Sequence, residues 1–268
     1  MHFFSGMTAL VSGASSGLGL ALAHSLVAAG ARVAITGTSR SKLDAALEQF
    51  SDRSAVLPLA FDVSDEAAWR LAESRVRAEF GPIRFLVLNA GVGMGGDRIE
   101  DTPSDIWRWA WQINVMGVVH GLQACLPHMR ADGLESHVMA TSSVAGVWRC
   151  PSVGPYGVTK AAVVALAESL RIELAGTRVG CSVLLPGKIR TALPETSKRS
   201  APLKLSPTLV DAMTSFLADG LDPNDVAAYA LDRVRAGAFY IFTHPQIDDE
   251  IAARQSELAQ AMTTTISR

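Results

Sequence analysis

The sequence is poor in the features that mark several classes of protein. Its three cysteines, Cys125, Cys150 and Cys181, are widely spaced and include no CxxC pair, so we expect neither a disulfide framework nor a cysteine metal site. The six histidines share no metal-ligand spacing, and no apolar run approaches the ~18 residues of a membrane span. Residues 1–7 lack the basic start of a signal peptide. We therefore expect a reduced, cytoplasmic protein without a bound metal.

An excess of charge of either sign is also missing. The 24 Lys and Arg residues nearly balance the 26 Asp and Glu residues, which gives a net charge of -2. Nucleic acids and anionic membranes are therefore not expected partners, and small molecules are. With 49% hydrophobic residues in 268, the chain can form a sizeable core, and we expect one globular domain over 1–268.

Short apolar runs alternate along the chain with longer helical patterns. Many of the runs are almost continuously apolar, which is typical of strands covered by helices on both faces of a sheet. This alternation predicts the α/β class with a doubly wound parallel sheet of about seven strands. The expected strands are 8–11, 32–36, 55–60, 85–89, 137–141, 181–185 and 239–243, and the expected helices are 18–29, 42–50, 66–80, 103–129 and 156–175.

Residues 188–222 interrupt this alternation. The segment is rich in proline and serine and carries the basic residues Lys198, Arg199 and Lys204. Long connections of this kind in compact domains are often functional, so we expect a substrate lid here.

A glycine-rich turn joins the first expected strand to the first expected helix. Gly13 permits a tight turn, Gly17 lets the backbone approach a phosphate, and Gly19 lets the helix pack closely on the strand. The free amides of a helix N-terminus bind a dinucleotide pyrophosphate, so the turn predicts a Rossmann-type cofactor site that includes Ser15, Ser16 and Leu18. The spacing is GxxxGxG rather than GxGxxG, and the alternative is a turn without a ligand.

The end of the second expected strand bears on which dinucleotide binds. An acidic residue there usually binds the adenosine ribose, but Gly37 occupies that place. Thr38, Ser39 and Arg40 follow and offer hydroxyl groups and a guanidinium to a 2'-phosphate. NADP is therefore favoured and NAD is possible; the alternative is that Arg40 is a solvated charge that opens the next helix.

Tyr156 and Lys160 are four residues apart at the start of a helical pattern, so their side chains share one face of the helix. A tyrosine with a pKa near ~10 is a poor acid or base at neutral pH, but a nearby ammonium and an oxidised nicotinamide favour its phenolate. We expect Tyr156 to exchange a proton with a substrate. The alternative is a solvent-facing pair.

Taken in order, these motifs resemble the short-chain dehydrogenase/reductase family over nearly the whole chain. Ser12 departs from the threonine that the family usually has at that position, but the hydroxyl is kept. Ser143 lies thirteen residues before Tyr156, as the family pattern requires. The other matching residues are Asp62, Val63, Asn89, Ala90, Gly91, Asn114, Pro186, Gly187, Ile189 and Thr191.

The resemblance implies a catalytic tetrad. Ser143 would hold the substrate oxygen, Tyr156 would exchange the proton, Lys160 would bind the nicotinamide ribose, and Asn114 would hold a water that relays protons. Alternatives remain open: Ser142 could replace its neighbour, and Asn114 could simply interrupt its helix.

Two of the matching cofactor residues also have structural readings. Asn89 could be a turn residue at a strand end, and Asp62 could be a neighbour of a helix cap.

The expected substrate is an apolar or aromatic alcohol or ketone. Met94 and Trp148 are candidate walls of its pocket, together with Cys150 and Pro151, although the first two could equally be packing residues. Residues 240–245 weakly resemble bacterial aryl-alcohol dehydrogenases. The family also implies a homodimer or homotetramer that pairs through helices 115–129 and 161–175. The alternatives to an NADP-preferring enzyme are an NAD-preferring oxidative dehydrogenase and a non-catalytic nucleotide-binding regulator.

Overall fold

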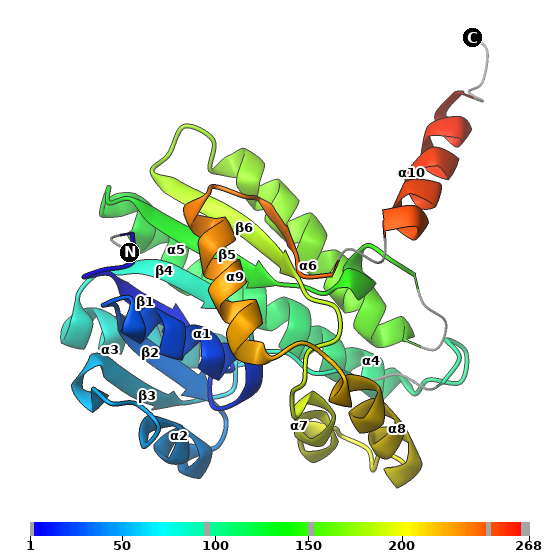
Figure 1. Ribbon diagram of the computed structural model, residues 1–268, viewed down its shortest axis with the longest axis horizontal. Helices are drawn as coiled ribbons and strands as arrows, with labels where there is room; N and C mark the ends of the chain where they lie inside the picture. Colours follow the sequence, from blue (N-terminus) through cyan, green and yellow to red (C-terminus); the bar gives the residue numbers. More distant parts are fainter. Residues whose placement is uncertain (1–2, 94–96, 150–152, 245–247, 264–268) are drawn as a thin grey trace.

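The computed structural model describes residues 3–93, 97–149, 153–244 and 248–263. Its centre is a seven-stranded sheet in the order β3-β2-β1-β4-β5-β6-β7, in which neighbouring strands run parallel (Figure 1). The predicted class and strand number are confirmed, and each predicted strand overlaps an observed one. The strands are β1 (Thr8–Val11), β2 (Arg32–Gly37), β3 (Val56–Ala60), β4 (Ile83–Leu88), β5 (Ser136–Thr141), β6 (Val179–Leu185) and β7 (Tyr240–Phe242).

Helices cover both faces of the sheet because successive strand residues point to opposite sides. Along β1, Ala9 and Val11 contribute to one hydrophobic cluster, whereas Leu10 contributes to the other. The first cluster contains side chains of α1 (Gly17–Ala28), α2 (Arg40–Leu47) and α9 (Pro223–Arg235). The second contains side chains of α3 (Glu66–Phe80), α5 (Gly117–Ala131) and α6 (Gly154–Glu173).

The order of the strands creates a crevice at the middle of the sheet. The chain builds outward from β1 through β2 to β3 and then crosses back to place β4 on the other side of β1. Connections at the carboxyl ends of β1 and β4 therefore run to opposite sides. Open parallel sheets bind their ligands at such a reversal.

The prediction of one uninterrupted α-helix over 103–129 is wrong, because a π-helical turn divides it. Three pieces replace it: α4 (Ser104–Trp111), the π-helical turn η2 (Gln112–Met116) and α5. Asn114 lies within η2 and is buried. Side-chain hydrogen bonds from Asn114 to groups outside the helix accompany the wider turn, and such turns are frequent at functional sites.

The segment 188–222 lies outside the sheet. It forms α7 (Leu193–Ser200) and α8 (Pro207–Ala218), which pack against each other below the carboxyl ends of the strands (Figure 1). Two short 3-10 turns, η1 (Arg53–Ala55) and η3 (Val144–Gly146), complete the connections. At the end of the chain, α10 (Asp248–Thr263) projects away from the body (Figure 1). Among the described residues, no helix has the length and apolar content needed to cross a membrane.

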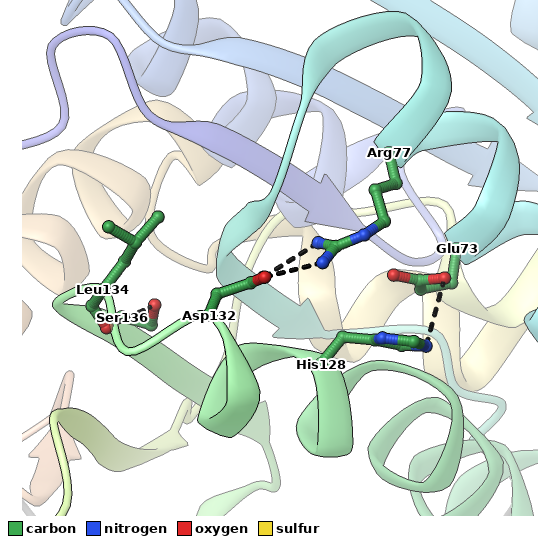
Figure 2. A network of polar contacts seen from close by, with 6 residues as sticks. All are labelled: Glu73, Arg77, His128, Asp132, Leu134 and Ser136. Carbon is green, nitrogen blue, oxygen red and sulfur yellow. Dashed lines mark hydrogen bonds and ion pairs between the residues drawn. The ribbon is translucent and has the colours of Figure 1, made fainter.

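Polar contacts join α3 to α5 on one face of the sheet (Figure 2). Arg77 donates two hydrogen bonds, of 2.8 and 2.6 Å, to the carboxylate of Asp132 just beyond α5. Glu73 lies 3.8 Å from His128 and is itself buried. Burial raises the pKa of Glu73, and the charges of His128 and Arg77 oppose that rise. The two-bond pair of Arg77 therefore holds the ends of two helices together.

Replacement of Arg77 by methionine should lower the free energy of unfolding by about 1–2 kcal/mol, because Asp132 would lose its partner in a partly buried position. Urea denaturation measures the change. Arg75→Met is the matched control on the same helix, since Arg75 forms an exposed pair with Glu79. It should change stability by less than about 0.5 kcal/mol. Equal effects of the two substitutions would contradict the assignment.

Candidate active site

The glycine turn after β1 is closed by contacts that only glycine allows. Gly13 has a φ of +65°, and a Cβ placed on it would lie 2.7 Å from Cα of Ala90, beyond β4. A Cβ on Gly19 would lie 2.6 Å from Nδ2 of Asn89, so α1 packs directly against the turn. Gly17 also has a positive φ, of +57°. The turn and the start of α1 thus form a close-fitting cradle at the crevice.

Ser12 and Asn89 tie the ends of β1 and β4 together. The Ser12 hydroxyl accepts hydrogen bonds from the backbone amides of Asn89 (2.9 Å) and Ala90 (3.0 Å). The Asn89 side chain donates to the carbonyls of Ser12 (3.0 Å) and Gly13 (3.3 Å). Asn89 is therefore the structural residue that the alternative reading describes, and Ser12 retains the hydroxyl function that the departure from threonine put in question.

The end of β2 has room for little beyond glycine. A Cβ on Gly37 would lie 3.0 Å from Oγ of Ser15, so Ser15 already fills the space beside it. The helix that follows begins at Arg40, earlier than the expected 42, and Ser39 caps it by accepting a 3.4 Å hydrogen bond from the amide of Lys42. Thr38, before the cap, is exposed.

Arg40 is exposed and donates a 2.8 Å hydrogen bond from Nε to Asp44 one turn later. Its guanidinium therefore lies at the helix start, as the alternative reading proposes, and keeps further donors for another anion. Lys42 is nearby, and its pKa is lowered by burial and then by the charge of Arg199. The fold thus brings a cation of α7 toward the start of α2.

Lys160 is buried, so the reading of a solvent-facing pair with Tyr156 is wrong. Its Nζ donates a 2.9 Å hydrogen bond to the carbonyl of Thr141 and lies 5.8 Å from the centre of the Tyr156 ring. Burial lowers the pKa of Lys160 to about 8. A lysine with such a pKa both holds and releases a proton near neutral pH.

The side chains of Tyr156 and Ser143 are hydrogen-bonded to each other. A hydrogen bond with Ser143 lowers the pKa of Tyr156, but burial raises it by more. The net direction is opposite to the expected shift toward phenolate, because the chain's own groups desolvate the phenol more than they stabilise its anion. The Ser143 hydroxyl also donates to the carbonyl of Pro186 at 3.3 Å.

Ser142 points elsewhere. Its hydroxyl is buried and donates a 2.7 Å hydrogen bond to the carbonyl of Lys160. A Cβ on Gly146 would lie 2.6 Å from that hydroxyl, so the groove in which Ser142 sits depends on a glycine. The structure therefore places Ser143, and not Ser142, against Tyr156.

Asn114 joins three segments around the lysine. Its Oδ1 accepts from the amide of Val92 (2.8 Å), and its Nδ2 donates to the carbonyl of Val92 (2.9 Å) and to Oγ1 of Thr159 (3.0 Å). A Cβ on Gly91 would lie 3.2 Å from both Asn114 Oδ1 and Lys160 Nζ. Gly91 thus leaves the space between these two polar atoms open.

The other expected site residues fall into distinct places. Asp62 is exposed and accepts hydrogen bonds from the amide (2.9 Å) and hydroxyl (2.8 Å) of Ser64, which fits the cap-neighbour reading, and Val63 beside it is buried. Thr191 lies against Gly17, and Ile189 is buried. Ser16 precedes α1 in extended conformation, and Leu18 is buried in that helix.

Trp148 is partly buried in the connection after η3. Met94, Cys150 and Pro151 lie outside the described residues.

Three residues of the site are absent from the expectations. Thr159 supports Asn114, and its position directly before Lys160 was the available signal. Ser197 of α7 is fully buried and accepts a 2.9 Å hydrogen bond from the amide of Gly93. His244, after β7, contacts Gly187. No local pattern in the sequence gives the last two a role in the site, although His244 lies within the stretch 240–245 that resembles aryl-alcohol dehydrogenases.

The described residues contain no cluster of three or more His, Cys, Asp or Glu that could hold a metal ion. The glycine cradle, by contrast, fits a nicotinamide dinucleotide, because it leads directly into the N-terminus of α1, where the first backbone amides of a helix are available to a pyrophosphate. A cavity of about 610 Å³ continues from Gly17 and Thr191 along α1 toward His24, and α7 and α8 form part of its walls. It lies beside the cradle and does not include Tyr156.

Comparison with known proteins agrees with this geometry. The model of the family described as short chain dehydrogenase matches residues 7–201. The C alpha-dehydrogenase of Sphingobium sp. strain SYK-6 is 28% identical over 256 residues, which cover 92% of this chain and 83% of that protein. The NADP-dependent (R)-specific alcohol dehydrogenase of Lentilactobacillus kefiri is 31% identical over 190 residues, covering 70% and 75%. The crystal structure of a short chain dehydrogenase/reductase from Burkholderia phymatum in complex with NAD has a TM-score of 0.90 at 30% identity and covers 100% of this chain and 99% of that chain.

Proposed function

The chain belongs to the short-chain dehydrogenase family, and from this we propose that it transfers hydride between a nicotinamide cofactor and an alcohol or ketone. The observation that carries the proposal is the meeting of Ser143, Tyr156 and buried Lys160 at the carboxyl edge of the sheet, next to the glycine cradle. The bound nicotinamide supplies or accepts the hydride. The protein residues bind and orient the substrate and handle its proton.

Ser143 and Tyr156 act on the oxygen of the substrate. In the free chain the single proton of the Ser143 hydroxyl is donated to the Pro186 carbonyl. When the substrate is bound, the hydroxyl turns to donate this proton to the substrate carbonyl oxygen and stabilises the charge that develops there. Tyr156 is protonated in the free chain, since burial raises its pKa, so it is ready to donate the phenolic proton in the direction of ketone reduction. In alcohol oxidation the same hydroxyl must first lose its proton, and the positive charge of a bound oxidised nicotinamide favours that loss.

Lys160 and Asn114 restore the proton. With a pKa of about 8, Lys160 carries a positive charge at neutral pH that favours the Tyr156 anion, and it can also pass on a proton. Asn114 Oδ1 faces the open space at Gly91 with an acceptor position left free for a water molecule. Thr159 holds Asn114 in this orientation.

The substrate is proposed to be apolar or aromatic, with segment 188–222 as its lid. A Cβ on Gly93 would lie 3.0 Å from Leu193 of α7 and 3.7 Å from the Tyr156 ring, so the lid reaches the reacting group. Ser197 fastens α7 to Gly93. Leu193 adds an apolar side chain near Tyr156, and the partly buried Trp148 is proposed as a further apolar wall of the substrate pocket.

Turnover should depend on Tyr156. Replacement of Tyr156 by phenylalanine should lower kcat at least about 100-fold, because the proton donor is lost, while cofactor binding is largely retained. A screen of aryl ketones, steroids, sugars and acyl ketones with NADPH and NADH measures the activity, and we expect the aryl ketones to be preferred. Tyr229→Phe, at an exposed tyrosine of α9, is the control and should keep full activity.

Unchanged turnover in the Tyr156→Phe variant would refute the mechanism. Cofactor binding by the unmodified chain without turnover of any compound would instead support the non-catalytic regulator.

NADP is proposed as the preferred cofactor. The end of β2 carries no carboxylate at Gly37, and Arg40, Lys42 and Arg199 supply positive charge near the start of α2. The similar Lentilactobacillus kefiri enzyme is described as NADP-dependent. The Burkholderia phymatum structure contains NAD, however, and this favours NAD as the second candidate.

Replacement of Arg40 by alanine tests this preference. We expect kcat/KM with NADPH to fall about tenfold, because a charge-assisted hydrogen bond to the 2'-phosphate is lost, and kcat/KM with NADH to stay unchanged. Arg70→Ala is the matched control, since Arg70 forms the same kind of exposed one-turn pair with Glu66 on α3. A strong preference of the unmodified chain for NADH would overturn the role given to Arg40.

We also propose a homodimer or homotetramer in a reducing, cytoplasmic setting. Among the described residues Cys125 and Cys181 are free thiols. Ile172, which is 77% exposed, lies on α6, the helix that the family resemblance assigns to an interface. Light scattering on the purified chain should give two or four times the mass of one chain, and Ile172→Glu should lower it. A monomeric mass at micromolar concentration would contradict the assembly.

A further inference from the structure

The segment Pro186-Gly187, directly after β6, is held from two sides. On one side its Pro186 carbonyl accepts hydrogen bonds from the amide of Val144 (2.9 Å) and the hydroxyl of Ser143 (3.3 Å). On the other side the amide of Gly187 donates to Oγ1 of Thr243 (3.2 Å) and Nδ1 of His244 (3.2 Å), both just beyond β7. One short segment therefore connects the substrate-binding serine to the far edge of the sheet.

These hydrogen bonds define the state of the His244 ring. Because the Gly187 amide can only donate, Nδ1 must be the unprotonated nitrogen, and the ring is neutral. The Thr243 hydroxyl lies 2.7 Å from the same nitrogen, and the Gly187 amide is shared between Thr243 Oγ1 and His244 Nδ1, so the three groups form one small network. Burial lowers the pKa of His244, a backbone hydrogen bond with Lys188 raises it, and the Lys188 charge lowers it, with burial the largest effect. Within the described residues, Lys188 is the charged group that acts on this ring.

Gly187 and His244 also fit each other in shape. A Cβ on Gly187 would lie 2.6 Å from Nδ1 and 2.7 Å from Cγ of His244, closer than such atoms approach. The imidazole therefore lies flat against the one position in the segment that has no side chain. Any larger residue at 187 would have to displace the ring.

We propose that His244 is a positioning residue, which clamps Gly187 and thereby holds the Pro186 carbonyl and the Ser143 hydroxyl in the geometry that the reaction needs. The inference deepens the proposed function and rests on it. His244 does not touch the reacting atoms, and its effect passes through the Pro186-Gly187 backbone. The proposal explains why a histidine at the far edge of the sheet is built into the site.

Three substitutions of His244 distinguish the loss of its hydrogen bond to Gly187 from a general loss of packing. Asparagine can place its amide oxygen near the position of Nδ1, whereas glutamine reaches toward the position of Nε2, and alanine offers no acceptor. We expect His244→Ala and His244→Gln to lower kcat/KM by about 10- to 100-fold, because small displacements of a reacting group are costly, and His244→Asn to recover most of it. Melting temperatures of all three identify any variant that is merely unfolded.

The pH profile gives a second readout. When the pH falls through the His244 pKa, which burial lowers from its ordinary value, Nδ1 gains a proton and no longer accepts from Gly187. kcat/KM of the unmodified enzyme should therefore decline on the acid side, and His244→Asn should lack this part of the decline. An acid limb of the same midpoint in both proteins would count against the clamp.

Amide hydrogen exchange tests the clamp without any turnover. In the free chain, a peptide that spans Pro186 and Gly187 should exchange at least about tenfold faster in His244→Ala than in the unmodified protein, and His244→Asn should restore protection. If the chain proves not to bind a nicotinamide cofactor, the proposed function fails while this measurement still judges the clamp. Unchanged exchange in His244→Ala would overturn the clamp even in an active enzyme.

A paired substitution checks the fit in shape. Gly187→Ala should disrupt the segment strongly when the histidine is present, and less in a chain that also carries His244→Ala. The fold-increase in the exchange rate of the double variant should therefore be smaller than the product of the fold-increases in the two single variants. Multiplicative effects would show that the two residues act independently and would also overturn the proposal.

Discussion

The hydrogen bonds between Ser12 and Asn89 hold together the point on which the rest of the site depends. The sheet reverses its direction of growth between β1 and β4, so the connections from these two strands separate and would leave unpaired amides and carbonyls at the crevice. One hydroxyl and one carboxamide satisfy four of those backbone groups. These bonds act together with the close packing of Gly13 against Ala90 to keep the glycine cradle in place.

Burial of the lysine is the second constraint. Removing an ammonium from water is costly, and the carbonyl of Thr141 offsets only part of that cost, so the pKa of Lys160 falls to about 8. The same burial raises the pKa of Tyr156. Both shifts favour the neutral forms of the two groups, which suits the proton exchange proposed for this pair better than a fixed ion pair.

The surrounding segments bring support from distant parts of the chain. Ser197 comes from the connection after β6, His244 from beyond the last strand, and Thr159 from the helix that carries the lysine. Ser197 and His244 each contact a backbone amide, that of Gly93 and that of Gly187, and Thr159 contacts the side chain of Asn114. The contacts that support the site therefore come from three separate segments of the C-terminal half of the chain.

The sequence by itself determined the class of fold, the seven strands and the family, because these depend on local apolar runs and on motifs with set spacing. It also selected Ser143 over Ser142, and the orientation of the two hydroxyls agrees with that choice. Only the tertiary structure decided that η2 interrupts the long helix at Asn114, that Arg199 approaches Lys42, and that His244 lies on Gly187. Each of these features depends on contacts between residues far apart in the chain. Sheet register and helix packing decide which residues meet, and no local sequence pattern encodes either.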